Sequence, residues 1–357
     1  MTKPPMLLAA ALAFSMAATT LPGAAGAAEL PTLKVKAIGL NGSTVVSSRD
    51  EVPFWTKTIS EASGGKVTAD IVPVDRSGIK DFQMMRMGKL GVTDFGAGDI
   101  SKMAGDDAVF EGCDLAGLTL SPEQARAACE AWKPMLAKAM SERFGIKLLA
   151  LGANPPQVFW CREPMSGLKD LKGKKIRVFN KTMNDFITAI GGTTVSMAFA
   201  EVVPALQRGV VDCAVTGSLS GNTAGWAEVS SHLYPLSLGW SINYQSVSES
   251  SWKKWSPETQ KFFLGQFAKF EDKMWETVGI ATSEGMTCNV NKQPCTIGKL
   301  VDMTIVPVSE ADQTLRKELM ESTVLVSWGK RCGKPCVEEW NKTVGKVVGL
   351  TIPVDKI

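Results

Sequence analysis

Residues 170–217 read DLKGKKIRVFNKTMNDFITAIGGTTVSMAFAEVVPALQRGVVDCAVTG, and this stretch decides the fold. Its short apolar runs predict strands at 174–178 and 210–215. Its longer segments, in which apolar residues recur every three or four positions, predict helices at 183–190 and 202–208. Strands that alternate with helices in this way are typical of α/β domains. We therefore predict an α/β fold.

Arg177 lies in the first of these strands, and Asn180 follows at the turn where the next helix begins. An arginine side chain binds a carboxylate through two parallel hydrogen bonds in one plane. Ligands of open α/β sheets bind beyond the carboxyl ends of the strands. Arg177 is therefore a candidate carboxylate ligand, although a single arginine in a strand is more often an exposed charge at a sheet edge.

Three blocks of this stretch resemble the signature of the DctP-like substrate-binding proteins of TRAP-type (tripartite ATP-independent periplasmic) transporters. The blocks are DLKGKKIRV at 170–178, MAFAEV at 197–202 and ALQRGVVD at 205–212. The resemblance implies a two-domain periplasmic-binding-protein architecture with a hinge and a long helix that spans both domains. The site residues that it implies are Arg177 for the substrate carboxylate, and Asn180 and Phe199 for the pocket wall.

The rest of the chain continues the α/β pattern. Alternating and apolar runs predict further strands at 33–38, 66–72, 92–97, 146–151 and 158–161. Periodic segments predict helices at 52–62, 81–87, 121–143 and 256–278. Residues 304–357 are expected to add one strand and two helices that pack against the second domain.

Two domains are expected, because 357 residues with 45% apolar content suffice for two hydrophobic cores. The double proline at 155–156 interrupts the chain between two predicted strands, and such a break favours a crossing from one domain to the other. The expected division is 29–155 with 242–282 for domain I, and 156–241 with 283–357 for domain II.

Residues 1–28 have the order of a secretory signal peptide. Lys3 supplies the positive charge, an apolar run follows, and the small residues at 25–28 suit a peptidase. A membrane anchor is the alternative, but the apolar run is too short to span a bilayer. The sequence therefore predicts cleavage near Ala27 or Ala28 and a periplasmic protein.

The eight cysteines fit an oxidising compartment, and their spacings match no zinc site. The chain has one histidine, so we expect neither a metal nor a cofactor. Structural disulfides are favoured over redox catalysis, because the cysteines of the most closely spaced pair are separated by three residues rather than two. The expected pairs are Cys113–Cys129, Cys288–Cys295 and Cys332–Cys336, which leaves Cys161–Cys213.

Further candidate site residues come from the predicted loops. Asn41 lies in a glycine-containing turn after the first strand, and Thr216 and Ser218 follow the strand at 210–215. Aromatic residues near the expected cleft include Trp240, although core packing is the usual place for such a residue. Arg162 lies near the position where sialic-acid-binding relatives carry a second arginine, but we expect it to face outward.

Composition and motifs exclude several classes of function. The formal net charge is +3, with 39 basic and 36 acidic residues and no basic run, which gives no support for nucleic-acid binding. The motifs of nucleophilic, nucleotide-binding and dinucleotide-binding enzymes are missing, so we do not expect an enzyme.

The sequence thus favours the periplasmic component of a TRAP transporter. We expect a monomer that binds a small organic acid between two closing domains and delivers it to the membrane subunits of the transporter. A carboxylate that is smaller or more apolar than a sugar acid or sialic acid is favoured. The alternatives are the ligand-binding module of a sensory system with the same fold and, less favoured, an exported enzyme.

Overall fold

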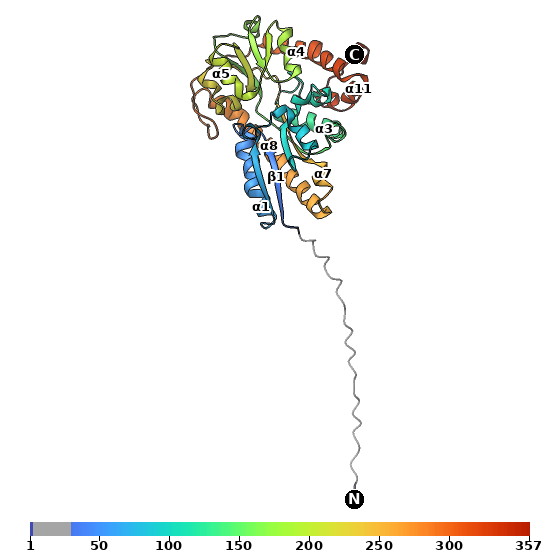
Figure 1. Ribbon diagram of the computed structural model, residues 1–357. Coiled ribbons are helices and arrows are strands. Elements are labelled where there is room, and N and C mark those ends of the chain that lie inside the picture. The colour runs from blue at the N-terminus through green and yellow to red at the C-terminus, as the bar shows by residue number, and fades with distance from the viewer. Residues whose placement is uncertain (3–29) are drawn as a thin grey trace.

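The computed structural model describes residues 1, 2 and 30–357, so the predicted signal peptide lies almost entirely outside the described residues. The described chain forms two sheets surrounded by helices. In Figure 1 the N-terminal elements occupy the lower part of the molecule, and α4 and α5 occupy the upper part. The predicted α/β class is confirmed, as is the two-domain architecture.

The first sheet has the strand order β2-β1-β3-β10-β4. Strand β1 pairs in parallel with β2 and β3, whereas β10 is antiparallel to β3 and β4. The sequence did not predict β10, which follows β9 of the second sheet in the chain and lies between β3 and β4, two strands from much earlier in the sequence. The strands are β1 (Leu33–Gly39), β2 (Val67–Pro73), β3 (Phe95–Asp99), β4 (Ile146–Ala153) and β10 (Ile242–Ser248).

The second sheet has the order β11-β9-β5-β8-β6-β7. Strand β6 is parallel to β7 and β8, and β5 is antiparallel to β8 and β9. The chain passes from the first sheet to the second through the double proline, which follows β4, and returns between β9 and β10. The strands are β5 (Gln157–Cys161), β6 (Lys175–Val178), β7 (Thr193–Ser196), β8 (Cys213–Gly217), β9 (His232–Tyr234) and β11 (Thr304–Ile305).

The helices before the double proline largely follow the predicted pattern. The helical region predicted at 52–62 begins earlier, with η1. The sequence did not show this start, because the buried Asp50 and Glu51 interrupt the apolar period of the segment. Helix α3 begins as its sequence requires, since the Ser121 hydroxyl accepts a hydrogen bond from the Gln124 amide at 3.2 Å. The segments are η1 (Val46–Glu51), η2 (Phe54–Thr58), α1 (Ile59–Ala62), η3 (Val74–Arg76), η4 (Asp81–Gln83), α2 (Met84–Lys89), η5 (Ile100–Met103), η6 (Ala108–Glu111) and α3 (Pro122–Phe144).

The helices around the second sheet are shorter. The Asn180 side chain caps α4 by accepting a hydrogen bond from the Met183 amide at 2.9 Å. The segments are η7 (Leu168–Leu171), α4 (Lys181–Ala189), η8 (Phe199–Glu201), α5 (Val202–Gln207), α6 (Ser218–Thr223), η9 (Trp226–Glu228) and, after β10, α7 (Glu249–Trp252).

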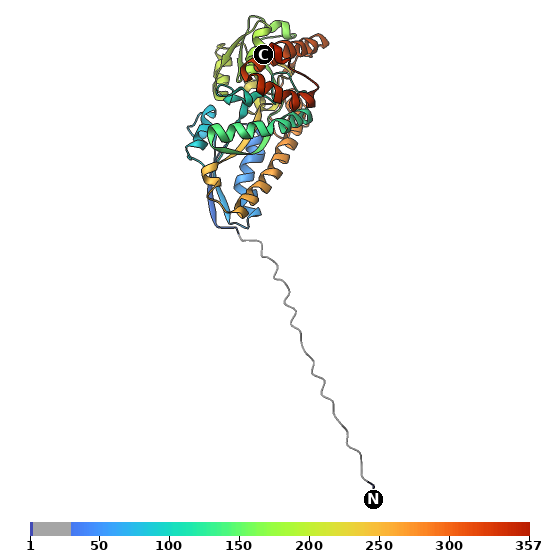
Figure 2. The ribbon, with the colours of Figure 1, turned by 90° about the vertical axis from the view of Figure 1, so that its right-hand side faces the viewer.

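Helix α8 (Pro257–Thr287) is the long helix that was expected to contact both domains. Its first half packs Phe263, Phe267 and Phe270 into the core of the first sheet. Its last turns contact α6 of the second unit, where Ala281 lies in a cluster with Leu219. Figure 2 shows this helix in orange along the length of the lower part. One continuous helix thus connects the two units.

The C-terminal region differs from the prediction of two helices. Its first helical stretch runs without a break through α9, η10 and α10 to Gly333, with φ of 84°, and α11 and α12 follow as separate helices before Gly349, with φ of 72°. These helices pack on α4 and also on α3, as the red and green helices of Figure 2 show, so their contacts extend beyond the second unit. The segments are α9 (Glu310–Leu319), η10 (Met320–Val324), α10 (Leu325–Cys332), α11 (Lys334–Lys342) and α12 (Val344–Val348), followed by η11 (Val354–Lys356).

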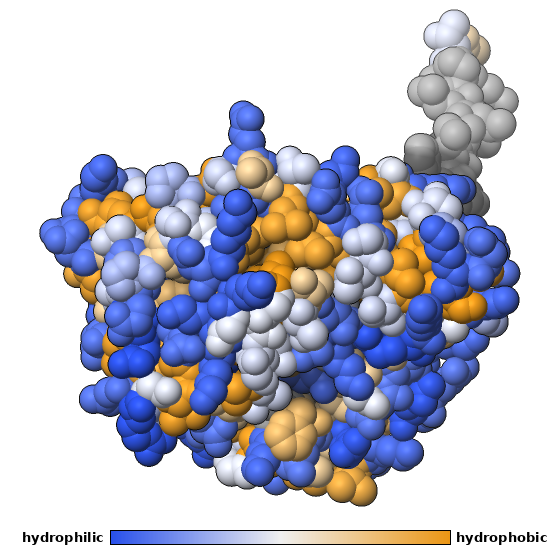
Figure 3. All heavy atoms as spheres, turned by 90° about the horizontal axis from the view of Figure 1, so that it is seen from above, coloured by the Kyte–Doolittle hydropathy of each residue, from blue (hydrophilic) through white to orange (hydrophobic). Residues whose placement is uncertain are grey.

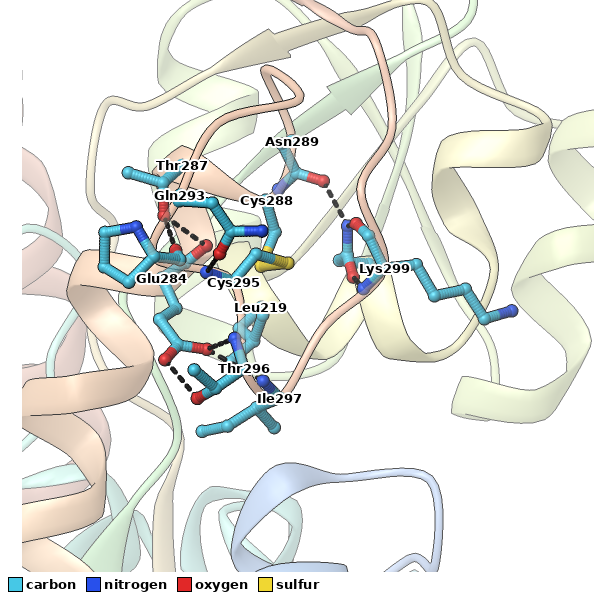
Figure 4. Close-up of a disulfide and its surroundings, with 12 residues drawn as sticks. Leu219, Glu284, Thr287, Cys288, Asn289, Gln293, Cys295, Thr296, Ile297 and Lys299 are labelled. Atoms are coloured by element: carbon cyan, nitrogen blue, oxygen red, sulfur yellow. Dashed lines mark hydrogen bonds between the residues drawn. A yellow bond between two sulfur atoms is a disulfide. The ribbon is translucent and has the colours of Figure 1, made fainter.

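All four predicted disulfides are present, namely Cys113–Cys129, Cys161–Cys213, Cys288–Cys295 and Cys332–Cys336. The disulfide Cys288–Cys295 closes a loop after α8 (Figure 4). In the same loop, the Thr296 and Ile297 amides donate hydrogen bonds to the Glu284 carboxylate, both at 2.9 Å. The loop then contacts α6, since the Asn222 side chain donates to the Lys299 carbonyl at 2.8 Å. The disulfide loop therefore packs against α6 and stabilises its position.

The surface seen from above is mainly hydrophilic, with separate apolar areas between charged side chains (Figure 3). Within the part of the chain that the structure describes, no helix is both long enough and apolar enough to cross a membrane.

Candidate functional site

Arg177 is buried in the second sheet, on the strand next to the edge strand β7, and only 2% of the residue is exposed. Its strand β6 lies between β7 and β8, so the side chain is enclosed by neighbours on both sides. The guanidinium donates to the Val215 carbonyl at 2.9 Å and to the Met197 carbonyl at 3.2 and 3.3 Å. These contacts fix the plane of the cation, which is therefore preorganised for a planar anion.

Aromatic rings lie around the same guanidinium. Its central carbon is 5.3 Å from the ring centre of Phe179 and 5.7 Å from that of Trp226. Phe199 stacks on Trp226 with the ring centres 5.3 Å apart. The rings limit access of water to the cation, and a charge-assisted hydrogen bond is stronger where water is excluded.

A cavity of about 70 Å³ lies beside Arg177 and is lined by both units of the molecule. It shares Arg177, Phe179 and Phe199 with a wider cavity of about 760 Å³. The inner space therefore forms the narrow end of a cleft between the two sheets. Its lining residues are Leu40, Asn41, Thr44, Val74, Gly98, Asp99, Lys102, Asn154, Gln157, Arg177, Phe179, Phe199, Thr216, Ser220, Ser241 and Asn243.

Four of the eight predicted site residues line this inner cavity, namely Arg177, Asn41, Phe199 and Thr216. They come from four separated parts of the sequence. Asn41 is placed by a turn in which its Oδ1 accepts hydrogen bonds from the Ser43 amide at 3.0 Å and the Ser43 hydroxyl at 2.6 Å. Thr216 lies on β8, the strand that pairs with β6 on one side and β5 on the other.

The structure does not bring Asn180 or Ser218 to the inner cavity. Asn180 caps α4 and lines a different cavity of about 580 Å³, which Phe179 also lines. Ser218 begins α6 and faces α8, where its hydroxyl lies against Gly285. Ser220, two residues later on the same helix, lines the cavity instead.

Trp240 and Arg162 also lie away from the inner cavity. Trp240 is buried in the core, and its indole N–H donates to the Thr119 carbonyl at 3.3 Å. Arg162 is half-buried just beyond the end of β5, where its main-chain amide donates to the Asp212 carbonyl at 3.0 Å.

The cavity has a polar wall that the sequence did not predict. Asp99 Oδ2 accepts a hydrogen bond from the Ser241 hydroxyl at 2.5 Å. Asn154 Nδ2 donates to Ser241 Oγ at 3.2 Å and reaches Asn243 Oδ1 at 3.4 Å. Asn243 is the register partner of Asp99 across β3 and β10, which explains why these distant positions meet.

Two buried carboxyl groups support the backbone beside the cavity. The Glu51 carboxylate accepts hydrogen bonds from the Leu40 amide at 2.7 Å and from Gln245 Nε2 at 2.9 Å. The Asp114 carboxylate accepts from the amides of Trp240 and Ser241, at 2.9 and 2.8 Å. Burial raises the pKa of each carboxyl to about 7, against the effect of these hydrogen bonds.

Within residues 1, 2 and 30–357, no group of three or more His, Cys, Asp or Glu side chains could hold a metal ion. The polar groups of the cavity are one guanidinium, one amine, one carboxylate, and several amides and hydroxyls. This set suits reversible binding of a polar molecule through hydrogen bonds.

Comparison with known proteins also indicates a solute-binding protein. The model of the family described as bacterial extracellular solute-binding protein, family 7, matches residues 45–323. An uncharacterized protein of Haemophilus influenzae is 29% identical over 136 residues, which cover 38% of this chain and 42% of the relative, so the match spans less than half of that relative.

Two solved structures share the fold. DctP7 of Bordetella pertussis, an extracytoplasmic solute receptor binding pyroglutamic acid, has a TM-score of 0.77 at 17% identity, and the alignment covers 87% of this chain and 98% of the receptor. A TRAP periplasmic solute-binding protein of Desulfovibrio salexigens, with bound orotic acid, has a TM-score of 0.75 at 19% identity, covering 88% and 99%.

The fold and the family match define a solute-binding protein rather than an enzyme. The chain belongs to bacterial extracellular solute-binding protein family 7, the family of the TRAP-type solute receptors.

Proposed function

We propose that this protein is the periplasmic receptor of a TRAP transporter and binds a small organic acid whose carboxylate contacts Arg177. The observation that carries the proposal is a rigidly oriented, buried guanidinium at the wall of a cavity between the two sheets. A bidentate pair between arginine and a carboxylate is strongest in such a place. Phe199, Asn41 and Thr216 complete the proposed binding surface.

The comparisons support an organic acid as the ligand class. The two solved relatives described above bind pyroglutamic acid and orotic acid, which are both small carboxylic acids. The acid that we propose is smaller or more apolar than a sugar acid, and it would bind in the inner cavity beside Arg177.

Binding is proposed to close two domains around the ligand, domain I being 29–155 with 242–282 and domain II being 156–241 with 283–357. Cavity residues from both sides support this mechanism. The two sides also touch directly, because the Thr223 hydroxyl donates to the Ser43 carbonyl at 3.0 Å. Closure would remove the carboxylate from water and present a new surface to the membrane subunits.

The proposed site is tested with purified protein freed of ligand by unfolding and refolding. Thermal melts are measured against a panel of small mono- and dicarboxylic acids, with the neutral primary amide of each acid as its control. A ligand of the folded state raises the melting temperature in proportion to ln(1 + [L]/Kd). We expect one or a few acids to raise it and their amides not to. A panel in which no acid acts, or in which amides act equally, contradicts the proposal.

A further inference from the structure

The polar wall of the cavity presents hydrogen-bonding atoms that have no partner among the residues that the structure describes. They are Asn154 Oδ1, Asn243 Nδ2 and Ser220 Oγ. These residues are 9%, 3% and 3% exposed, and all three line the inner cavity. A buried polar group without a hydrogen bond destabilises the folded state, so such groups are rare unless something else binds them.

We propose that Asn154 and Asn243 select a carboxylic acid that also carries a neutral amide or lactam, whose C=O and N–H pair with these two side chains. The inference rests on the proposed function, because the carboxylate of the same molecule contacts Arg177. It adds the second recognition element and thereby the substrate class.

The orientation of both amides follows from Asp99. A carboxylate only accepts hydrogen bonds, so the Ser241 hydroxyl must donate its proton to Asp99 Oδ2. Ser241 Oγ can then only accept, and the Asn154 group that faces it must be the NH2 group. The same NH2 group lies against the Asn243 side chain, which therefore points its oxygen Oδ1 toward Asn154.

This chain of donors leaves one acceptor and one donor for a ligand. Asn154 offers Oδ1, and Asn243 offers the two hydrogens of Nδ2. The two side chains touch each other, so the free acceptor and the free donor lie on neighbouring groups. An amide edge, with N–H beside C=O, satisfies both at once.

A second carboxylate fits this wall poorly. It has no donor for Asn154 Oδ1, and the Asp99 carboxylate is only one hydrogen-bonded residue away through Ser241. Lys102 also lines the cavity, but it lines both wider cavities too, so an acid group bound there would lie toward the mouth. Such a dicarboxylate would leave the two asparagine atoms without partners.

A hydrocarbon group fits no better, because it would seal the same atoms from water without replacing their hydrogen bonds. Sites built to bind polar groups reject analogues that lack them for this reason.

The test is calorimetry with four acids on the parent protein. Pyroglutamate carries the carboxylate and the lactam, cyclopentanecarboxylate keeps the ring and carboxylate, glutarate has a second carboxylate, and glutaramate has an open-chain amide. We expect one of the two amides to bind best, at least about tenfold more tightly than its partner without an amide. Asn154→Leu, Asn243→Leu and the milder Asn243→Asp should reduce this ratio toward one.

A matched control is Asn341→Leu, which removes an amide that is bonded at both ends to the main chain of Ile352 outside the cavity. This variant should keep the parent ratio, and thermal melts show that each variant is folded. If cyclopentanecarboxylate or glutarate binds as tightly as the better of the two amides, the inference is overturned while the carboxylate function stands. If none of the four acids and no member of the wider panel binds, the proposed function itself fails.

Discussion

Replacement of Arg177 tests the proposed carboxylate contact directly. Arg177→Ala removes the cation and leaves the ligand charge without its partner in the closed cleft. Loss of one member of a buried charged pair weakens binding by roughly 2 to 5 kcal/mol, or about thirtyfold to several thousandfold in Kd. Arg177→Lys keeps the charge but lacks the planar fork, so we expect a smaller but clear loss.

The same side chain also stabilises the fold, which the experiment must separate from binding. Its hydrogen bonds to Val215 and Met197 contribute about 1 kcal/mol each to stability, so the alanine variant should melt at a lower temperature without ligand. Calorimetry is therefore done well below the melting temperature of each variant, with the best acid from the panel. The matched control is Arg208→Ala, an exposed arginine of the same region, which should bind like the parent.

Two results would refute the reasoning. The first is Arg177→Ala binding within threefold of the parent while folded. The second is loss of binding in Arg162→Ala, which would mean that the anchor is the other arginine and that the cavity beside Arg177 is not the site.

Three other predictions concern the whole molecule. Solution scattering should give a smaller radius of gyration at saturating ligand, and an unchanged curve would indicate a rigid, preformed site instead. Intact mass of the exported protein should correspond to a chain that starts near Ala28 or Glu29 and takes up no alkylating reagent without reductant; a retained Met1 or several added alkyl groups would contradict it. The pKa of Glu51 is raised from 4.5 to about 7 by burial, so the folded state binds an extra proton in this range and its stability should fall as pH rises from 4.5 to 7. Glu51→Gln should flatten that part of a plot of melting temperature against pH, and an equally steep plot would assign the effect elsewhere.

The parts of the fold that could be predicted are those in which neighbours in sequence are neighbours in space. Ser121 and Gln124 predicted the start of α3 because a helix cap involves residues three apart. The close cysteine pairs formed as expected for the same reason. Arg177 could be placed on a short strand because the residues around it form a local pattern, and it lies on β6 between β7 and β8.

The polar wall could not be predicted, because its residues meet only through the sheet. Asp99 and Asn243 are separated by more than a hundred residues and become neighbours when β10 inserts between β3 and β4. No local sequence pattern predicts that a strand inserts between two earlier strands in this way. Ser218 was predicted as a site residue and Ser220 was not, but only Ser220 lines the inner cavity, since two residues along a helix turn a side chain by about 200°. The sequence predicted a loop at 217–221, where the structure has α6, so it could not show which residues face the cavity.

Ser241 connects ligand recognition to the crossing between the two sheets. Ser241 lies in the segment that returns to the first sheet, and its backbone has a positive φ of 52°. Its main-chain amide donates a hydrogen bond to the Asp114 carboxylate. Its hydroxyl orients both asparagines through Asp99. The acceptor and the donor that the cavity offers to a ligand are therefore set by the segment that returns from the second sheet to the first.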